Sequence, residues 1–125
     1  MKVLLKKGRN LTFFIYCSEN QNRVQDFFQS LKQKRSIEYQ KLVSLIDKSS
    51  ENRILLIKNP EKFKKIEDNL YEIKSHQVRI WCYMDKDENI VLIDGYLKKS
   101  NKIPKNELKK AKSILKQSLM EEKNL

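Results

Sequence analysis

The sequence predicts a single α+β domain over residues 1–125, in the order β-α-α-β-β-β-α. An antiparallel sheet would pack against an N-terminal helical hairpin, and a C-terminal helix would follow. Three observations predict this class. An aromatic, β-branched run comes first, two stretches with apolar residues at helical spacing follow, and three segments of period-two alternation precede a long amphipathic tail. A chain of this length fits one domain with its own hydrophobic core.

The first half of the chain predicts one strand and two helices. The run LTFFIYC, residues 11–17, is typical of a strand, whose start could lie earlier, in the run KVLL. Residues 22–34 place apolar side chains on one helix face. A second helix is expected to begin near Ser36, as its N-cap, and to end in the turn-forming run DKSSEN. The run ILLI, residues 54–57, fits either a short strand or a helix end.

The second half predicts an antiparallel meander followed by a helix. The runs LYEIKS, VRIWCYMD and IVLIDGYL alternate with period two and are joined by short turns. Alternate residues of the middle strand lie on opposite faces, and we expect the helices to cover the face of Val78, Ile80, Cys82 and Met84. The other face carries Arg79, Trp81 and Tyr83. Pro104 opens the last helix, which has an apolar stripe and a lysine-rich face.

The charge of the chain indicates an anionic partner. It contains 27 Lys and Arg residues against 16 Asp and Glu, a formal net charge of +11. Such an excess repels itself, so RNA or DNA is the first partner to expect, and a membrane surface or an acidic protein the next. The alternative is a general lysine bias, which the many Asn and Ile residues also fit.

Metal, cofactor and membrane classes are not expected. Cys17, Cys82 and the single histidine lack the spacing of a metal site. Reduced thiols fit a cytoplasmic protein. No apolar run reaches the roughly 18 residues of a membrane span. The N-terminal apolar run is too short for a signal peptide. The phosphate-binding loops GxxxxGK[ST] and GxGxxG are missing from the sequence.

Cationic side chains gather around the predicted meander. If register allows, Lys74, Arg79, Lys98 and Lys99 converge, and an anion among them would relieve their mutual repulsion. The alternative is an ordinary charged sheet face turned to water. Trp81 and Tyr83 would stack on nucleic-acid bases beside the cations, or be half-buried sheet aromatics. His76, in a turn, fits a solvent-exposed polar residue, and as the only imidazole it excludes a two-histidine ribonuclease mechanism.

The segment from Leu70 to Ala111 resembles the signature of HigB-like toxins in the RelE/ParE toxin superfamily, and the wider likeness spans about residues 13–118. The matching residues are Leu70-Tyr71-Glu72-Ile73-Lys74, Val78-Arg79-Ile80, Gly95-Tyr96, Lys98-Lys99-Ser100, Pro104, Glu107 and Ala111. Asp94 departs from the pattern, because relatives frequently carry a histidine before this glycine. The resemblance implies a RelE-like fold.

The resemblance also implies a type II toxin that cuts mRNA on the ribosome, silenced by a cognate helix-turn-helix antitoxin similar to HigA. The 2′-hydroxyl of a ribose would attack the adjacent phosphate, which requires charge stabilisation and proton transfer. Arg79 and Lys98 would hold the phosphate, with Lys99 adding charge, and Tyr96 or Asp94 would assist proton transfer. Further RNA contacts are expected from Lys74, His76, Trp81, Tyr83 and Lys102.

Two other functions stay open at this stage. The same superfamily includes ParE-like toxins that poison DNA gyrase instead of cutting RNA. A third reading is an RNA- or ribosome-binding protein whose nuclease site has decayed, with the basic C-terminal helix as the binding element. Salt-sensitive RNA binding without cleavage would identify the last of these.

Overall fold

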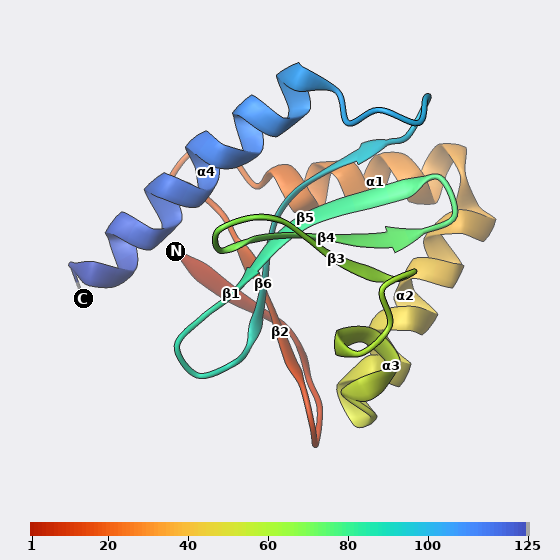
Figure 1. Ribbon diagram of the computed structural model, residues 1–125, viewed down its shortest axis with the longest axis horizontal. Helices are drawn as coiled ribbons and strands as arrows, with labels where there is room; N and C mark the ends of the chain where they lie inside the picture. Colours follow the sequence, from red (N-terminus) through yellow and green to blue (C-terminus); the bar gives the residue numbers. More distant parts are fainter. Residues whose placement is uncertain (125) are drawn as a thin grey trace.

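The computed structural model describes residues 1–124, which form a six-stranded mixed sheet and four helices. Figure 1 shows α4 on one side of the sheet and α1, α2 and α3 on the other. The sheet order is β1-β2-β6-β5-β4-β3. The bounds are β1 Lys2–Lys7, β2 Thr12–Tyr16, α1 Arg23–Lys34, α2 Ser36–Glu51, α3 Ile54–Ile57, β3 Phe63–Glu67, β4 Leu70–Ser75, β5 Val78–Met84, β6 Ile90–Leu97 and α4 Lys105–Lys123.

The α+β class and the C-terminal helix are confirmed, but the predicted sheet is wrong in two respects. It is mixed, because β2 runs parallel to β6, with Phe13 beside Ile90, whereas the other neighbouring strands are antiparallel. The helical hairpin is also not N-terminal, since the β1–β2 hairpin precedes it. A parallel pair needs a long crossover connection. Here the connection from β2 to β6 contains the helices α1–α3 and the strands β3, β4 and β5. Local sequence patterns carry no signal for so distant a pairing.

The structure decides four local points that the sequence left open or predicted otherwise. The segment Phe63–Glu67 is a strand at the sheet edge, where exposed lysines such as Lys64 and Lys65 protect against pairing with another chain. The run ILLI is a short helix. Helix α2 continues to Glu51, because Ser50 is buried against the β1–β2 turn and its carbonyl oxygen accepts hydrogen bonds from two backbone N–H groups there. Its N-cap is Arg35, not Ser36.

The sheet is buried on both faces, in two separate cores. The face toward α1 and α2 carries Val78, Ile80 and Cys82 of β5, as predicted. The opposite face carries Trp81 and Tyr83, which are fully buried under α4 together with Ala111 and Leu115 of that helix. The alternative of a second sheet face turned to water is therefore wrong over most of its length, because the apolar stripe of α4 covers that face.

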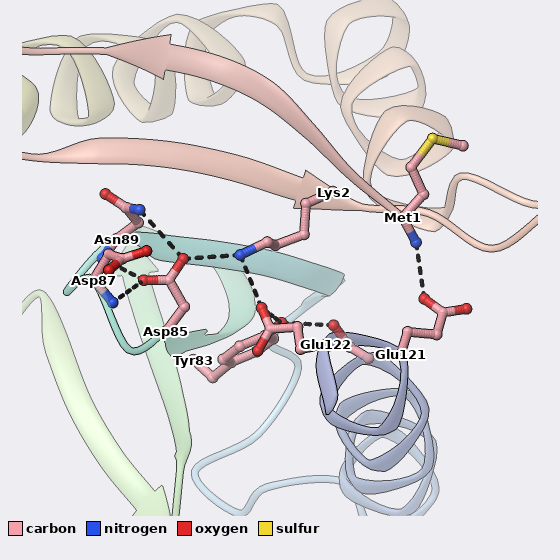
Figure 2. A network of polar contacts seen from close by, with 9 residues as sticks. Met1, Lys2, Tyr83, Asp85, Asp87, Asn89, Glu121 and Glu122 are labelled. Carbon is pink, nitrogen blue, oxygen red and sulfur yellow. Dashed lines mark hydrogen bonds and ion pairs between the residues drawn. The ribbon is translucent and has the colours of Figure 1, made fainter. Parts of the chain in front are cut away.

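A polar network fixes the C-terminal half of α4 to the sheet (Figure 2). The Lys2 ammonium lies 3.0 Å from an Asp85 carboxylate oxygen and 2.8 Å from one of Glu122. The Tyr83 hydroxyl shares a 2.6 Å hydrogen bond with Ser118 and donates to the Glu122 carboxylate at 3.1 Å. Strands β1 and β5 are thereby joined to one turn of α4. None of the helices within residues 1–124 is long and apolar enough to span a membrane.

Asp85 also organises the turn between β5 and β6. One carboxylate oxygen accepts the backbone N–H groups of Asp87 and Asn89, each at 2.9 Å. Burial acts to raise the pKa of this carboxyl, but the Asn89 hydrogen bonds and the Lys2 ammonium outweigh burial, so the Asp85 pKa lies below its ordinary value. The charged carboxylate is thus the form that the folded state stabilises.

Candidate functional site

Cationic side chains from neighbouring strands meet at one end of the sheet, on the face that α4 covers. Lys74 of β4 is the register partner of Arg79 of β5, and Arg79 is the partner of Tyr96 of β6. The backbone N–H of Lys98 donates to the Gln77 carbonyl at 2.7 Å, which places Lys98 just beyond Tyr96 on the same side. The sequence predicts that Lys74, Arg79, Lys98 and Lys99 converge; the register brings the first three together, and Lys99 lies beyond the end of β6. We call these three residues the cationic sheet end.

Arg79 is the buried member of the cationic sheet end. Its side chain is only 10% exposed, and its Nε atom lies 3.8 Å from a carboxylate oxygen of Glu72, which is itself 5% exposed. Its Nη1 atom donates to the carbonyl oxygens of His76 and Val78. An arginine held in this way is fixed in position and supplies positive charge from beneath the surface.

Tyr96 lies beside Arg79 and is bound to the same carboxylate. Its hydroxyl donates to a Glu72 oxygen at 2.8 Å, and its ring stacks on Trp81 with centroids 5.5 Å apart. Burial raises the pKa of Tyr96, and the hydrogen bond to Glu72 and the charge of that carboxylate raise it further. The phenol is therefore protonated at neutral pH, and its hydroxyl acts as a hydrogen-bond donor.

The accessible groups of the region lie around this buried pair. Lys74 and Lys98 are partly exposed, Lys99 and Lys102 are fully on the surface, and none of them forms an ion pair with any described residue. His76 is exposed in the β4–β5 turn with φ of 57°. It precedes Gln77, the residue to which Lys98 bonds, so its imidazole is at the same end of the sheet.

Asp94 occupies a different position from the one that proton transfer would require. One carboxylate oxygen lies 3.0 Å from Nε of Arg23, at the start of α1, and the other accepts the Gly95 N–H at 2.9 Å. The side chain is 4% exposed. Both oxygens are thus engaged, and Asp94 fixes Arg23 against the sheet. We therefore do not retain it as a proton-transfer group.

Trp81 and Tyr83 cannot stack on RNA bases in this structure. Both are 0% exposed, and α4 covers the ring faces that a base would need. Their predicted role in base stacking is therefore wrong, and their aromatic character serves the core under α4 instead. The alternation rule places them on the correct face of β5 but gives no information on what covers that face.

Sequence reasoning missed two residues of this region. The sequence places Glu72 only within a motif, whereas in the structure it joins Arg79 to Tyr96. An acidic residue at an inward position of a strand, opposite Trp81 in the register, is the signal that could have identified it. Arg23 was not singled out, because its partner Asp94 lies 71 positions away in the chain. The pairing of Arg23 with Asp94 follows from no local sequence pattern.

The fold and the site together define a small basic α+β protein that presents lysines at one end of a largely buried sheet. Residues 26–116 match the family described as phage derived protein Gp49-like (DUF891). The match covers more than half of the chain, and the chain belongs to this family, a RelE/ParE-like toxin family of toxin–antitoxin systems. Membership implies a cognate antitoxin as partner. No curated protein matches the chain.

Proposed function

We propose that this protein is a HigB-like toxin that cleaves mRNA on the ribosome and thereby inhibits translation. The single observation that carries the proposal is the cationic sheet end, where Lys74 and Lys98 flank the buried Arg79 beside Tyr96. Family membership supports the toxin class. The nuclease activity and the dependence on the ribosome are the proposed parts.

The cationic sheet end offers what a scissile phosphate requires. Lys74 and Lys98 are partly exposed and would contact the phosphate oxygens, while Arg79 adds a fixed positive charge beneath them. Preorganised cations stabilise the additional negative charge of the phosphorane more than that of the ground state, which lowers the barrier to 2′-hydroxyl attack. Lys99 and Lys102 would contact the flanking backbone.

Two groups would move protons in this reaction. Tyr96 is protonated and would donate to the leaving 5′-oxygen, whose alkoxide is the stronger base, and the phenolate would then regain a proton from water. His76 is exposed at the same end of the sheet, and imidazole is the side chain best suited to accept a proton near neutral pH. We assign it as the base for the 2′-hydroxyl.

Primer-extension mapping of a defined mRNA in a purified translation system tests the proposal. The variants are Lys98→Ala and His76→Asn, since asparagine tolerates the left-handed backbone at this position. We expect cuts that require ribosomes and that fall by about 100-fold or more in each variant, the range of one lost charge-stabilising or acid–base group. Lys48→Ala, an exposed lysine on α2, is the matched control and should cut normally.

The partner in this proposal is an antitoxin of the helix-turn-helix class similar to HigA. It would be expected to bind and silence the toxin, so co-expression of the two proteins should suppress the cuts. If wild-type protein produces no cuts under any condition, the nuclease proposal is wrong. Salt-sensitive RNA binding without cuts would then favour the decayed, RNA-binding alternative. DNA damage that depends on gyrase would favour the ParE-like alternative.

A further inference from the structure

A groove of about 530 Å³ lies between α4 and the segment that leads from β2 into α1. Figure 1 shows this segment passing behind α4. The groove is not used by the cationic sheet end, whose residues do not line it. Its size is that of a small-molecule site, and its lining combines three kinds of side chain that together indicate the class of ligand.

Cations line one part of the groove. Arg23 is held through Nε by Asp94, and its two terminal guanidinium nitrogens form no hydrogen bond or ion pair within residues 1–124. The side chain is 32% exposed and lines the groove. Lys109 of α4 lines the same groove, and the part of its lining that the structure describes contains no carboxylate. The start of α1, a helix of 12 residues, adds a further preference for negative charge.

Apolar and amide side chains line the remainder. Ile93 and Ile114 give it an apolar floor, and Gln21 and Asn106 place amide groups, each with donors and an acceptor, at its edge. A bare phosphate would use the cations and leave most of this volume and all of the apolar floor unoccupied. A flat heterocycle joined to a phosphate would use all three kinds of side chain.

We propose that this groove binds a nucleoside phosphate, with the phosphate on Arg23 and Lys109 and the base against Ile93 and Ile114. Asp94 acts here as a positioning residue, because it orients the Arg23 guanidinium. The nucleotide comes either from the RNA substrate or from solution as a free mononucleotide. Asp94 precedes Tyr96 by two residues on β6, about 7 Å along the strand, so a nucleotide in the groove would neighbour one at the cationic sheet end. Assigning RNA as the source rests on the proposed nuclease function, but the binding chemistry does not.

Titrations of the isotope-labelled protein, followed by NMR, test the proposal. Guanosine and uridine monophosphates, a trinucleotide of non-cleavable 2′-O-methyl RNA, and inorganic phosphate are the probes. We expect saturable binding of the mononucleotides, with shifts in the side-chain amide signals of Gln21 and Asn106. In Lys109→Ala the affinity should fall about tenfold. Lys116→Ala, an exposed lysine on the same helix that does not line the groove, should bind as the wild type does.

A groove-filling variant and a comparison of ligand affinities complete the test of the nucleotide site. Ser113→Tyr, which fills the groove from the exposed side of α4, should abolish the shifts while leaving the unfolding transition unchanged. Trinucleotide binding at least tenfold tighter than mononucleotide binding would identify RNA as the source, and equal affinities would identify the free nucleotide. Inorganic phosphate binding as tightly as a mononucleotide, or the absence of saturable binding, would overturn the proposal. Displacement of the mononucleotide by a short Glu- and Leu-containing peptide of equal affinity would also overturn it, in favour of a protein partner.

Failure of this inference is distinguishable from failure of the proposed function. Ribosome-dependent cuts by a protein that binds no mononucleotide would overturn the nucleotide site and leave the nuclease intact. Saturable, Lys109-dependent mononucleotide binding by a protein that makes no cuts would support the site and refute the nuclease.

Discussion

Replacing Glu72 by glutamine tests whether the buried group of Glu72, Arg79 and Tyr96 holds the cationic sheet end together. The substitution keeps the shape of the side chain and removes its charge. At 3.8 Å, the attraction between Glu72 and Arg79 is about 4 kcal/mol with an effective dielectric constant near 20. Glutamine can still accept from Tyr96, but the hydrogen bond loses its charge assistance. Arg79 keeps its bonds to two carbonyl oxygens, which offsets part of the loss.

We therefore expect Glu72→Gln to lower the free energy of unfolding by about 3 kcal/mol, since a buried charge loses its partner. Urea denaturation at pH 7 measures this. The double variant Glu72→Gln, Arg79→Met should recover to within about 1 kcal/mol of the wild type, because it buries no unpaired charge. The Tyr96 pKa should also fall in Glu72→Gln, because the carboxylate that raised it is gone, and NMR titration of labelled tyrosine would detect the change.

Two results would refute this reasoning. A loss below about 1 kcal/mol in the single variant would mean that water screens the pair as it does at a surface. Independent, additive losses in the double variant would mean that Glu72 and Arg79 are not coupled. Either result would remove the argument that Arg79 is held in place for a phosphate.

Three further predictions concern the scaffold. Gly8→Ala should lower the free energy of unfolding by about 2–3 kcal/mol, as measured by urea denaturation. An added Cβ would overlap the backbone carbonyl of Ser50, and this carbonyl cannot move without displacing the end of α2. An unchanged free energy of unfolding would contradict the close approach of Gly8 to Ser50. The pKa of Asp85 is depressed in the folded state, so its contribution is present above the ordinary value of 3.8 and is lost as the pH falls through the lower folded pKa. Urea midpoints measured from pH 7 to pH 2 should therefore fall less steeply in Asp85→Asn than in the wild type, and parallel curves would contradict the assigned role. Glu88→Gly should raise the free energy of unfolding by up to about 1 kcal/mol, because Glu88 has φ of 63° and glycine adopts this conformation without strain. A lower thermal unfolding midpoint in the variant would contradict this prediction.

The parts of the fold that local patterns control could be predicted from the sequence. The strands β4, β5 and β6 alternate clearly, and α1 and α4 have apolar residues at helical spacing, so their positions were predicted to within a residue or two. The β1–β2 hairpin was read as one strand, and β3 was missed because lysines interrupt its alternation. What could not be predicted is how distant elements meet, above all the parallel contact of β2 with β6 and the covering of β5 by α4.

In the candidate site, too, features set by local sequence patterns could be predicted, whereas contacts between distant elements could not. Strand register follows from the short turns of the meander, so three of the four cations predicted to converge, Lys74, Arg79 and Lys98, are brought together, whereas Lys99 lies past the end of β6. Burial could not be predicted, because it depends on where α4 packs. Trp81 and Tyr83 therefore changed from expected base-stacking residues to core residues. Asp94 changed from a proton-transfer residue to the partner of Arg23, a contact between β6 and the start of α1.

The parallel pairing of β2 with β6 has a consequence for how the chain folds during synthesis. Phe13 lies beside Ile90 in the sheet, so the first hairpin has no strand to join until a strand 77 positions further along the chain has been made (90 − 13). Contacts between residues so far apart form slowly, because a long loop must close before they add any stability. The cationic sheet end cannot form before β6 has been made. Helix α4, which packs on the same face of the sheet, is made later still. A toxin built in this order would complete its site only after β6 and α4 have been made, when a partner already made could bind it.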